Sequence, residues 1–241
     1  MVGLRVSAPV AVPPLHTYVL ARDDNVVGVR APASPVRGRV DFPDDVDDVL
    51  RFRLRRGETL RAGLVLLAGS PARLDMYLFG PSTTDVTDLR QEPLFEKTRA
   101  LAADPLRLRA TARSTGPHFL DVLGKATYRL GWSIWSPGVV SDLTVSNDPF
   151  TPNGDGRADR TRVSWDLRRR GEVVLRIRDG DGRLVRHVDY GREPEGRESF
   201  SWNGRDQDGR KVAGGRYRVR LAWRDGEGRL SRSGVRVTVR R

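Results

Sequence analysis

Apolar and charged residues alternate along much of this chain, and a period of two predicts half-buried β-strands rather than helices. In Leu50-Arg51-Phe52-Arg53-Leu54 every second residue is apolar, and residues 161–167 repeat the pattern with Val163, Trp165 and Leu167 on one face. Further strands are predicted at residues 60–68, 74–79, 106–110, 118–123, 126–134, 173–177, 184–190, 217–223 and 235–239. The 25 glycines and 15 prolines interrupt long helical patterns. We therefore expect an all-β protein.

Turn-forming residues between these strands indicate two halves. Gly124-Lys125 predicts a turn in the first half, and Asp179-Gly180-Asp181-Gly182 predicts a hairpin in the second. Six or so short strands describe a jelly-roll-like β-sandwich, and seven strands in about 100 residues fit an immunoglobulin- or fibronectin-like sandwich. We predict two tandem β-sandwich domains: an irregular segment 1–35, a sandwich 36–136, a linker 137–143 and a second sandwich 144–241.

The first half carries a series of short motifs. They are the acidic stretch at residues 44–52, Gly57-Glu58-Thr59-Leu60, residues 74–81, His118-Phe119-Leu120-Asp121-Val122 and Tyr128-Arg129-Leu130. In this order and spacing they resemble the bacterial pre-peptidase C-terminal domain, a secreted β-sandwich module, over residues 36–135. The resemblance implies a module that accompanies a secreted peptidase or another exported enzyme.

The second half is organised around residues 147–159, which read N-D-P-F-T-P-N-G-D-G-R-A-D. Together with residues 174–185 and 202–212, this stretch resembles the immunoglobulin-like domain of the flagellar hook-capping protein and of many secreted bacterial enzymes, over residues 144–241. The capping protein also has a long N-terminal region that binds the hook, and nothing in this chain resembles that region. The resemblance implies an exported accessory module rather than a flagellar role.

The chain is strongly basic, with a formal net charge of +12, and all 43 basic residues except Lys97, Lys125 and Lys211 are arginine. A basic protein is a candidate nucleic-acid binder. These arginines, however, alternate with apolar residues as solvent-facing strand positions do, and no recognition motif accompanies them. No specific nucleic-acid binding is expected. The absence of cysteine excludes disulfides and cysteine-based metal sites.

No run of about 18 apolar residues is present, so no membrane span is expected. The N-terminal stretch is a poor signal peptide because Pro9, Pro13 and Pro14 interrupt its apolar part. The family resemblance nevertheless implies an extracellular or cell-surface location. Either export is not encoded here, or the chain is a fragment or has a misplaced start.

Asn153, Asp155 and Asp159 are the first candidate calcium ligands. Oxygen-bearing side chains at i, i+2 and i+6, beside a glycine, are similar to a calcium-binding loop. Two ligands of that pattern are missing, because Thr151 occupies the first position and Arg162 occupies the last, where a bidentate acid is needed. The alternative, which we favour, is turn chemistry, in which the Asn-Gly and Asp-Gly pairs reverse the chain with positive φ at both glycines.

Asp45 and Asp47 are the second candidate pair of calcium ligands. They cluster in sequence with Asp44 and Asp48, and alternation would place Asp45 and Asp47 on one face. Some pre-peptidase C-terminal modules hold calcium near such a cluster, so the resemblance implies a site here. The alternative, which we favour, is a solvated acidic loop that leads into a strand. The predicted cofactor is therefore none, or Ca²⁺.

The five tryptophans are the last candidates for binding. Trp165, Trp202 and Trp223 lie in the inward register of their strands, which predicts core packing. Trp132 and Trp135 flank the predicted linker, where they either pack or bind a ligand such as a carbohydrate. The three histidines have no zinc spacing, and no nucleophile elbow or phosphate-binding loop is present. We predict no catalytic residue.

The sequence thus predicts a non-catalytic accessory or structural module of an exported or cell-surface bacterial protein. Its expected partner is a catalytic domain or a cell-surface polymer. The alternatives are a carbohydrate- or cell-wall-binding module, an enzyme of unrecognised type and a nucleic-acid binder. The sequence leaves the specific ligand and the oligomeric state open.

Overall fold

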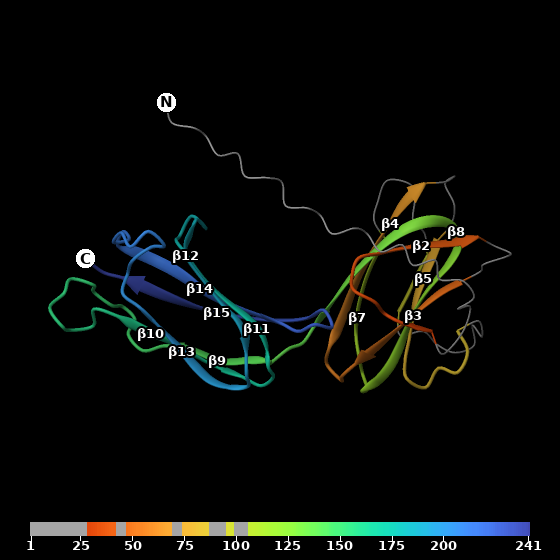
Figure 1. Cartoon of the computed structure of the whole chain (residues 1–241), viewed down its shortest axis with the longest axis horizontal. Helices are drawn as coiled ribbons and strands as arrows, with labels where there is room; N and C mark the ends of the chain where they lie inside the picture. The colour runs from red at the N-terminus through yellow and green to blue at the C-terminus, as the bar shows by residue number, and fades with distance from the viewer. Residues whose placement is uncertain (1–27, 42–46, 69–73, 87–94, 99–105) are drawn as a thin grey trace, which may run out of the picture. The chain divides into compact units, whose positions relative to one another are not determined.

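Every regular element in the described part of the chain is a β-strand, which confirms the all-β prediction (Figure 1). The computed structural model describes residues 28–41, 47–68, 74–86, 95–98 and 106–241. Within these ranges no helix is long and apolar enough to cross a membrane. The strands are β1 (Val29–Arg30), β2 (Val36–Asp41), β3 (Asp47–Leu54), β4 (Thr59–Ala68), β5 (Leu74–Phe79), β6 (Phe95–Thr98), β7 (Leu106–Thr111), β8 (Gly116–Trp135), β9 (Val140–Val145), β10 (Thr161–Leu167), β11 (Gly171–Arg178), β12 (Leu184–Glu193), β13 (Gly196–Trp202), β14 (Gly215–Arg224) and β15 (Arg229–Val239).

The chain folds into two compact units, each built from separate segments. The first unit takes the described parts of Met1–Phe52, Gly63–Arg107 and Phe119–Gly131, and the second takes Arg53–Ala62, Leu108–His118 and Trp132–Arg241. Strands β3, β4, β7 and β8 therefore contribute residues to both units. The predicted domains were continuous segments, and their boundaries stay a prediction.

Strand β8 organises the first unit, because it pairs with β2, β3, β4 and β5. Residues 119–124 pair antiparallel with β5, and residues 125–130 pair antiparallel with β2. The predicted turn at Gly124-Lys125 is therefore wrong. The chain continues as one strand, and Gly124 has a φ of 139° where the partner changes, a conformation that glycine adopts without strain. One core cluster of this unit consists of Val49, Tyr77, Phe79, Val86 and Phe119.

The second unit contains the seven strands expected of an immunoglobulin-like sandwich. They form two antiparallel sheets, ordered β12–β11–β14–β15 and β13–β10–β9. Every second residue of β10, β11 and β14 is buried, because the two sheets face each other across an apolar core. Trp165, Trp202 and Trp223 are each 1% exposed, which confirms their predicted core packing.

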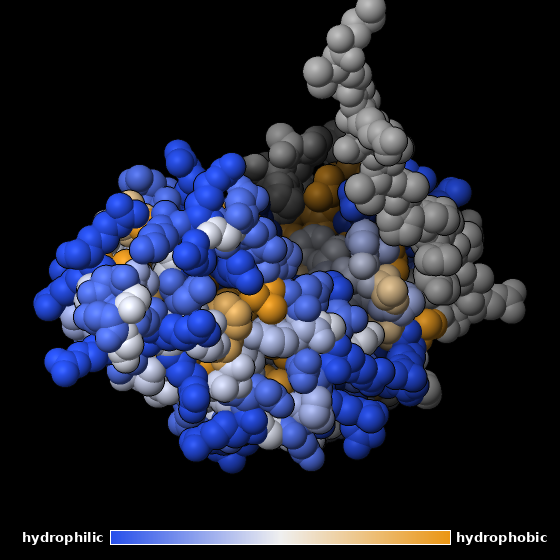
Figure 2. All heavy atoms as spheres, turned by 60° about the vertical axis from the view of Figure 1, so that its left-hand side comes forward, coloured by the Kyte–Doolittle hydropathy of each residue, from blue (hydrophilic) through white to orange (hydrophobic). Residues whose placement is uncertain are grey.

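Segments from the first half of the chain complete the second unit. Strand β15 pairs in parallel with the end of β8, where Arg229 lies opposite Ile134. The N–H of Gly57 donates to the carbonyl oxygen of Ala112, and the N–H of Ala112 donates to that of Glu58, both at 2.8 Å. The apolar faces of the strands in the second unit pack against each other in its core. In the view of Figure 2, polar side chains cover most of the described surface.

Candidate functional site

The stretch 147–159 is bound to the last strand of the second unit. Phe150 is fully buried, its N–H donates to the carbonyl oxygen of Thr238 at 3.0 Å, and its own carbonyl accepts from the N–H of Arg240 at 2.9 Å. The Oδ1 atom of Asp148 accepts from the N–H of Thr238 at 2.8 Å. This stretch therefore attaches the start of the sandwich to β15.

The candidate ligands Asn153, Asp155 and Asp159 do come together in this loop, but the loop itself occupies their oxygens. Asp159 accepts from the N–H of Gly154 at 2.5 Å and from the N–H of Gly156 at 2.7 Å. The side-chain amide of Asn153 donates to Asp155 at 2.8 Å, a contact that lowers the pKa of that carboxyl. The φ angles of Gly154 and Gly156 are 92° and 82°, which confirms the positive values expected of turn chemistry.

Replacing Asp159 with alanine should lower the free energy of unfolding of the second unit by about 1–2 kcal/mol, since two charge-assisted hydrogen bonds are lost at a partly exposed position. Asparagine keeps one acceptor oxygen, so Asp159→Asn should fall between the wild type and Asp159→Ala. Urea unfolding followed by tryptophan fluorescence measures this directly, because all five tryptophans lie in the second unit.

Asp208→Ala is the matched control for Asp159→Ala, because Asp208 lies in a different exposed loop of the second unit. Asp208 contacts only an exposed arginine, Arg210, at 3.2 Å, and its removal should change stability by less than about 0.5 kcal/mol. Equal effects of Asp159→Ala and Asp208→Ala would show that Asp159 does not hold the loop.

The structure describes only one residue of the second pair of candidate ligands. Asp45 lies outside the described residues, whereas Asp47 lies in β3 beside Asp48. Asp47 and Asp48 are 4% and 0% exposed, so these two residues are buried in a strand rather than part of a solvated loop. Asp75 on β5 and Asp121 on β8 are also buried. We refer to Asp47, Asp48, Asp75 and Asp121 as the acidic cluster.

Ionisation of Asp121, a member of the acidic cluster, is disfavoured by its surroundings. Burial, followed by the negative charges of Asp47, Asp48 and Asp75, raises the pKa of Asp121 well above its usual value. Its Oδ1 atom is buried and has no hydrogen-bond partner among the described residues. The acids and histidines of the described segments include no group of three or more placed to hold a metal ion. The raised pKa of Asp121 means that this carboxyl keeps its proton to a higher pH than an ordinary aspartate does.

Replacing Asp121 with asparagine should stabilise the first unit at neutral pH. Because the pKa of Asp121 is raised on folding, the folded state retains a proton that the unfolded state releases, and wild-type stability falls as the pH rises from the ordinary aspartate pKa towards the raised one. Asp121→Asn has no carboxyl at this position, so its stability does not fall with rising pH in this way. Its advantage should be largest at neutral pH and should shrink as the pH falls to about 4, as measured by urea unfolding followed by far-UV circular dichroism.

Asp41→Asn is the control for this pH dependence. Asp41 is held by Lys125 and Arg39, and these contacts lower its pKa, so its replacement should give no gain in stability at neutral pH. A gain for Asp121→Asn that is the same at every pH would contradict the assignment of a proton to Asp121.

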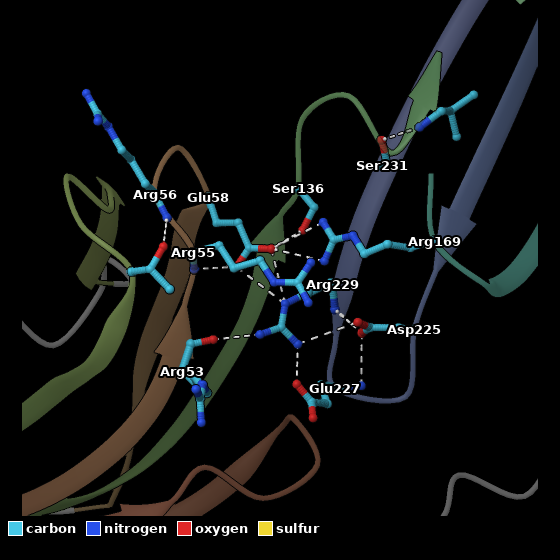
Figure 3. Close-up of polar contacts among 12 residues, drawn as sticks. Arg53, Arg55, Arg56, Glu58, Ser136, Arg169, Asp225, Glu227, Arg229 and Ser231 are labelled. Carbon is cyan, nitrogen blue, oxygen red and sulfur yellow. Dashed lines mark hydrogen bonds and ion pairs between the residues drawn. The ribbon is translucent and has the colours of Figure 1, made fainter. Parts of the chain in front are cut away.

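A buried ion-pair cluster surrounds Glu58 in the second unit (Figure 3). The hydroxyl of Ser136 donates to Oε1 of Glu58 at 2.7 Å, and Nε of Arg229 lies 3.2 Å from the same oxygen. Arg229 also donates from Nη2 to the carbonyl oxygen of Arg53 at 2.6 Å, and Arg169 lies 3.4 Å from Oε1. The side chains of Glu58 and Arg229 are only 3% and 7% exposed.

Both members of the central pair are charged at neutral pH. Burial raises the pKa of Glu58, but the N–H of Arg55, the hydroxyl of Ser136 and the charge of Arg229 outweigh it and lower the pKa below its usual value. Burial lowers the pKa of Arg229, but the carboxylates of Glu227 and Glu58 reverse that effect and raise it. Removing either partner would therefore leave a buried charge without its main counter-charge.

The ion-pair cluster around Glu58 was not predicted from the sequence. Glu58 appears in the sequence only as part of the motif Gly57-Glu58-Thr59-Leu60, and nothing near it marks a partner. In the structure it joins residues 53–62, the end of β8 and the β14–β15 hairpin. The cluster thus joins three segments of the second unit that are far apart in the sequence, and we refer to it as a structural clamp.

Trp132 and Trp135 are half-buried at the end of β8. Three residues apart in a strand, they point to opposite faces, so they do not form one flat stacking platform. The guanidinium of Arg61 lies 5.9 Å from the centroid of the Trp135 ring, a cation–π contact. Carbohydrate binding by either tryptophan alone stays a prediction.

The sandwich of the second unit contains a region that is similar to a known family of domains. Residues 154–227 match the FlgD Ig-like domain family. This match confirms the predicted resemblance of the second half, and the matched region includes the whole of β10 to β14.

Two solved structures are among those that are similar to parts of this chain. FlgD from P. aeruginosa is 21% identical, with a TM-score of 0.29, and the similarity covers 33% of this chain and 61% of that one. The pre-peptidase C-terminal domain of collagenase from Bacillus anthracis is 16% identical, with a TM-score of 0.30, and the similarity covers 44% of this chain and 90% of that one. A search of curated proteins found no significant match.

Proposed function

We propose that this chain is a non-catalytic accessory or structural module of an exported or cell-surface bacterial protein. The observation that carries the proposal is the match of residues 154–227 to the FlgD Ig-like domain, within a seven-stranded sandwich whose apolar faces are buried. A sandwich of this kind is a rigid body that can space, support or attach neighbouring domains.

The polar clusters of the structure support a structural role. Asp159 accepts from loop N–H groups, Glu58 pairs with Arg229, and Asp121 is buried with a raised pKa. Asp159 and Glu58 hold segments of the second unit together, whereas Asp121 is a buried acid whose ionisation costs stability. None of these three groups combines an accessible nucleophile with a positioned base, which is the arrangement that nucleophilic catalysis uses.

The exported setting and the partner belong to the same proposal. They rest on the resemblance of residues 36–135 and 144–241 to modules of secreted proteins. The partner would be a catalytic domain in the same protein or a polymer of the cell surface.

A substrate panel tests the non-catalytic part of the proposal. The purified chain should release no product above the buffer blank from peptide, ester, glycoside and phosphate substrates. Turnover that follows the protein through size-exclusion chromatography, and that disappears when the protein is unfolded in urea, would overturn it.

Calcium stabilisation stays a prediction with its own measurement. The ligands would include Asp45 and Asp47 in the first unit, or Asn153, Asp155 and Asp159 in the second. A bound ion raises the melting temperature in calcium relative to chelator, because ligand binding stabilises only the folded state. Far-UV circular dichroism should record such a rise if calcium binds, and tryptophan fluorescence should record it only for the second unit.

A further inference from the structure

The outer face of the four-stranded sheet in the second unit carries a dense array of arginines. Strand register places Arg178, Arg218 and Arg236 side by side across β11, β14 and β15. The neighbouring row pairs Arg176 with Arg220, and Arg216 precedes both rows on β14. We call these six residues the arginine face: Arg176, Arg178, Arg216, Arg218, Arg220 and Arg236.

The rows of the arginine face contain no acidic residue. In the neighbouring strand rows the acids are Asp189, opposite Val174, and Glu172, which already pairs with Arg224 at 2.5 Å. Asp179 and Asp181 lie in the turn that follows Arg178, and Nη1 of Arg178 donates to the carbonyl oxygen of Gly182 in this turn at 2.7 Å. Adjacent strands are about 4.8 Å apart, and like charges placed opposite each other destabilise a sheet. The face therefore carries a concentrated positive charge, with no acid opposite any of its six arginines in the strand register.

The other sheet of the same unit shows that overall composition does not explain this array. The outward residues of β10 are Arg162, Ser164 and Asp166, and the β13 residues opposite them are serines and one arginine, Arg197. That face mixes hydroxyls with both signs of charge. The arginines are thus concentrated on one sheet of the sandwich, although both sheets belong to one arginine-rich chain.

We propose that the arginine face binds an acidic polysaccharide. Guanidinium groups recognise carboxylates through paired hydrogen bonds. In the next row Val174 and Ala222 are small and lie beside the exposed Arg232, and Gly234 lies between arginines on β15, so an extended sugar chain can lie flat along β14. The array runs along β14 as a stripe, which suits a linear polymer carrying a regular series of carboxylates.

The same observations favour this ligand over two other polyanions. The arginine rows contain no phenylalanine, tyrosine or tryptophan on which bases could stack, and a flat sheet face does not enter a DNA groove. A single large apolar side chain, Leu184, lies exposed beside Arg178, whereas binding in a lipid interface uses a set of apolar residues.

The test is binding of the full chain to polygalacturonate, a linear polyuronate, by isothermal titration calorimetry in 0.15 M salt. The triple variant Arg178→Gln/Arg218→Gln/Arg236→Gln should bind at least about tenfold more weakly, because three charge contacts are lost. Arg160→Gln/Arg162→Gln/Arg197→Gln removes the same charge from elsewhere in the second unit and should weaken binding less than about threefold. Arg216→Gln/Arg220→Gln provides a second variant of the face, and tryptophan fluorescence checks that each variant is folded.

Equal losses in the two triple variants, or no loss in either, would overturn the proposal by showing that binding does not depend on this face. Tighter binding to single-stranded DNA or to anionic phospholipid vesicles than to polygalacturonate, under the same salt, would overturn the choice of ligand. The assay measures binding alone, so its outcome does not depend on the proposed non-catalytic role.

Discussion

Replacing Arg229 with methionine should lower the free energy of unfolding of the second unit by about 3–5 kcal/mol. Methionine can fill the space of the arginine stem but leaves Glu58, which is 3% exposed, without its main counter-charge. The lowered pKa of Glu58 means that the pair stabilises the fold above the ordinary glutamate pKa, and that this contribution is lost as the pH falls through the lowered value. The cost of the substitution should therefore shrink in acid. Urea unfolding followed by tryptophan fluorescence, at neutral and acidic pH, measures both effects.

Two further variants separate a buried ion pair from a general loss of charge. Arg224→Met removes an exposed pair with Glu172, whose side chains are 67% and 50% exposed, and should cost about 0–1 kcal/mol. The double variant Glu58→Gln/Arg229→Met should recover part of the loss, because no unpaired buried charge remains. If Arg229→Met costs no more than Arg224→Met, the Glu58 cluster is not a clamp.

Replacing Trp202 with alanine should also cost about 3–5 kcal/mol, since it opens a large cavity in the core of the second unit. The Trp202 ring is 1% exposed and makes edge contacts with Phe150 and Tyr217, at centroid distances of 5.3 and 5.2 Å. Its Nε1 donates to the carbonyl oxygen of Arg205 at 2.9 Å, which is lost as well. Urea unfolding followed by far-UV circular dichroism measures the loss without relying on the deleted fluorophore.

The neighbouring Phe200 provides the comparison for this substitution. Phe200 lies on the same strand but is only partly buried, so Phe200→Ala should cost clearly less than Trp202→Ala. Trp202→Phe keeps most of the ring volume, so it should cost less stability than Trp202→Ala. Similar losses for Trp202→Ala and Phe200→Ala would contradict the central place of Trp202 in the core.

Local pattern predicted most strands, because alternation depends on residues two apart. Val163, Trp165 and Leu167 are buried on one face as their spacing required. Which strands pair with each other does not follow from the local pattern. For this reason the predicted turn at Gly124-Lys125 was wrong. Gly124-Lys125 suits a turn, but it also suits the point at which β8 exchanges β5 for β2.

The same distinction applies to the candidate sites. The turn chemistry of the Asn153–Asp159 loop was predictable because Asp159 reaches N–H groups only three and five residues away. The Glu58–Arg229 pair joins residues 171 positions apart, and no local signal marks either residue. The acidic cluster likewise gathers carboxylates from three strands, so the sequence showed only Asp47 and Asp48 of its four members.

Fractionation of the source bacterium, with an epitope tag on this chain in its native context, tests the central claim most directly. An exported or cell-surface module should be found in the envelope, the periplasm or the medium, apart from a cytosolic marker enzyme. Recovery of the tagged chain only with that cytosolic marker would contradict the account.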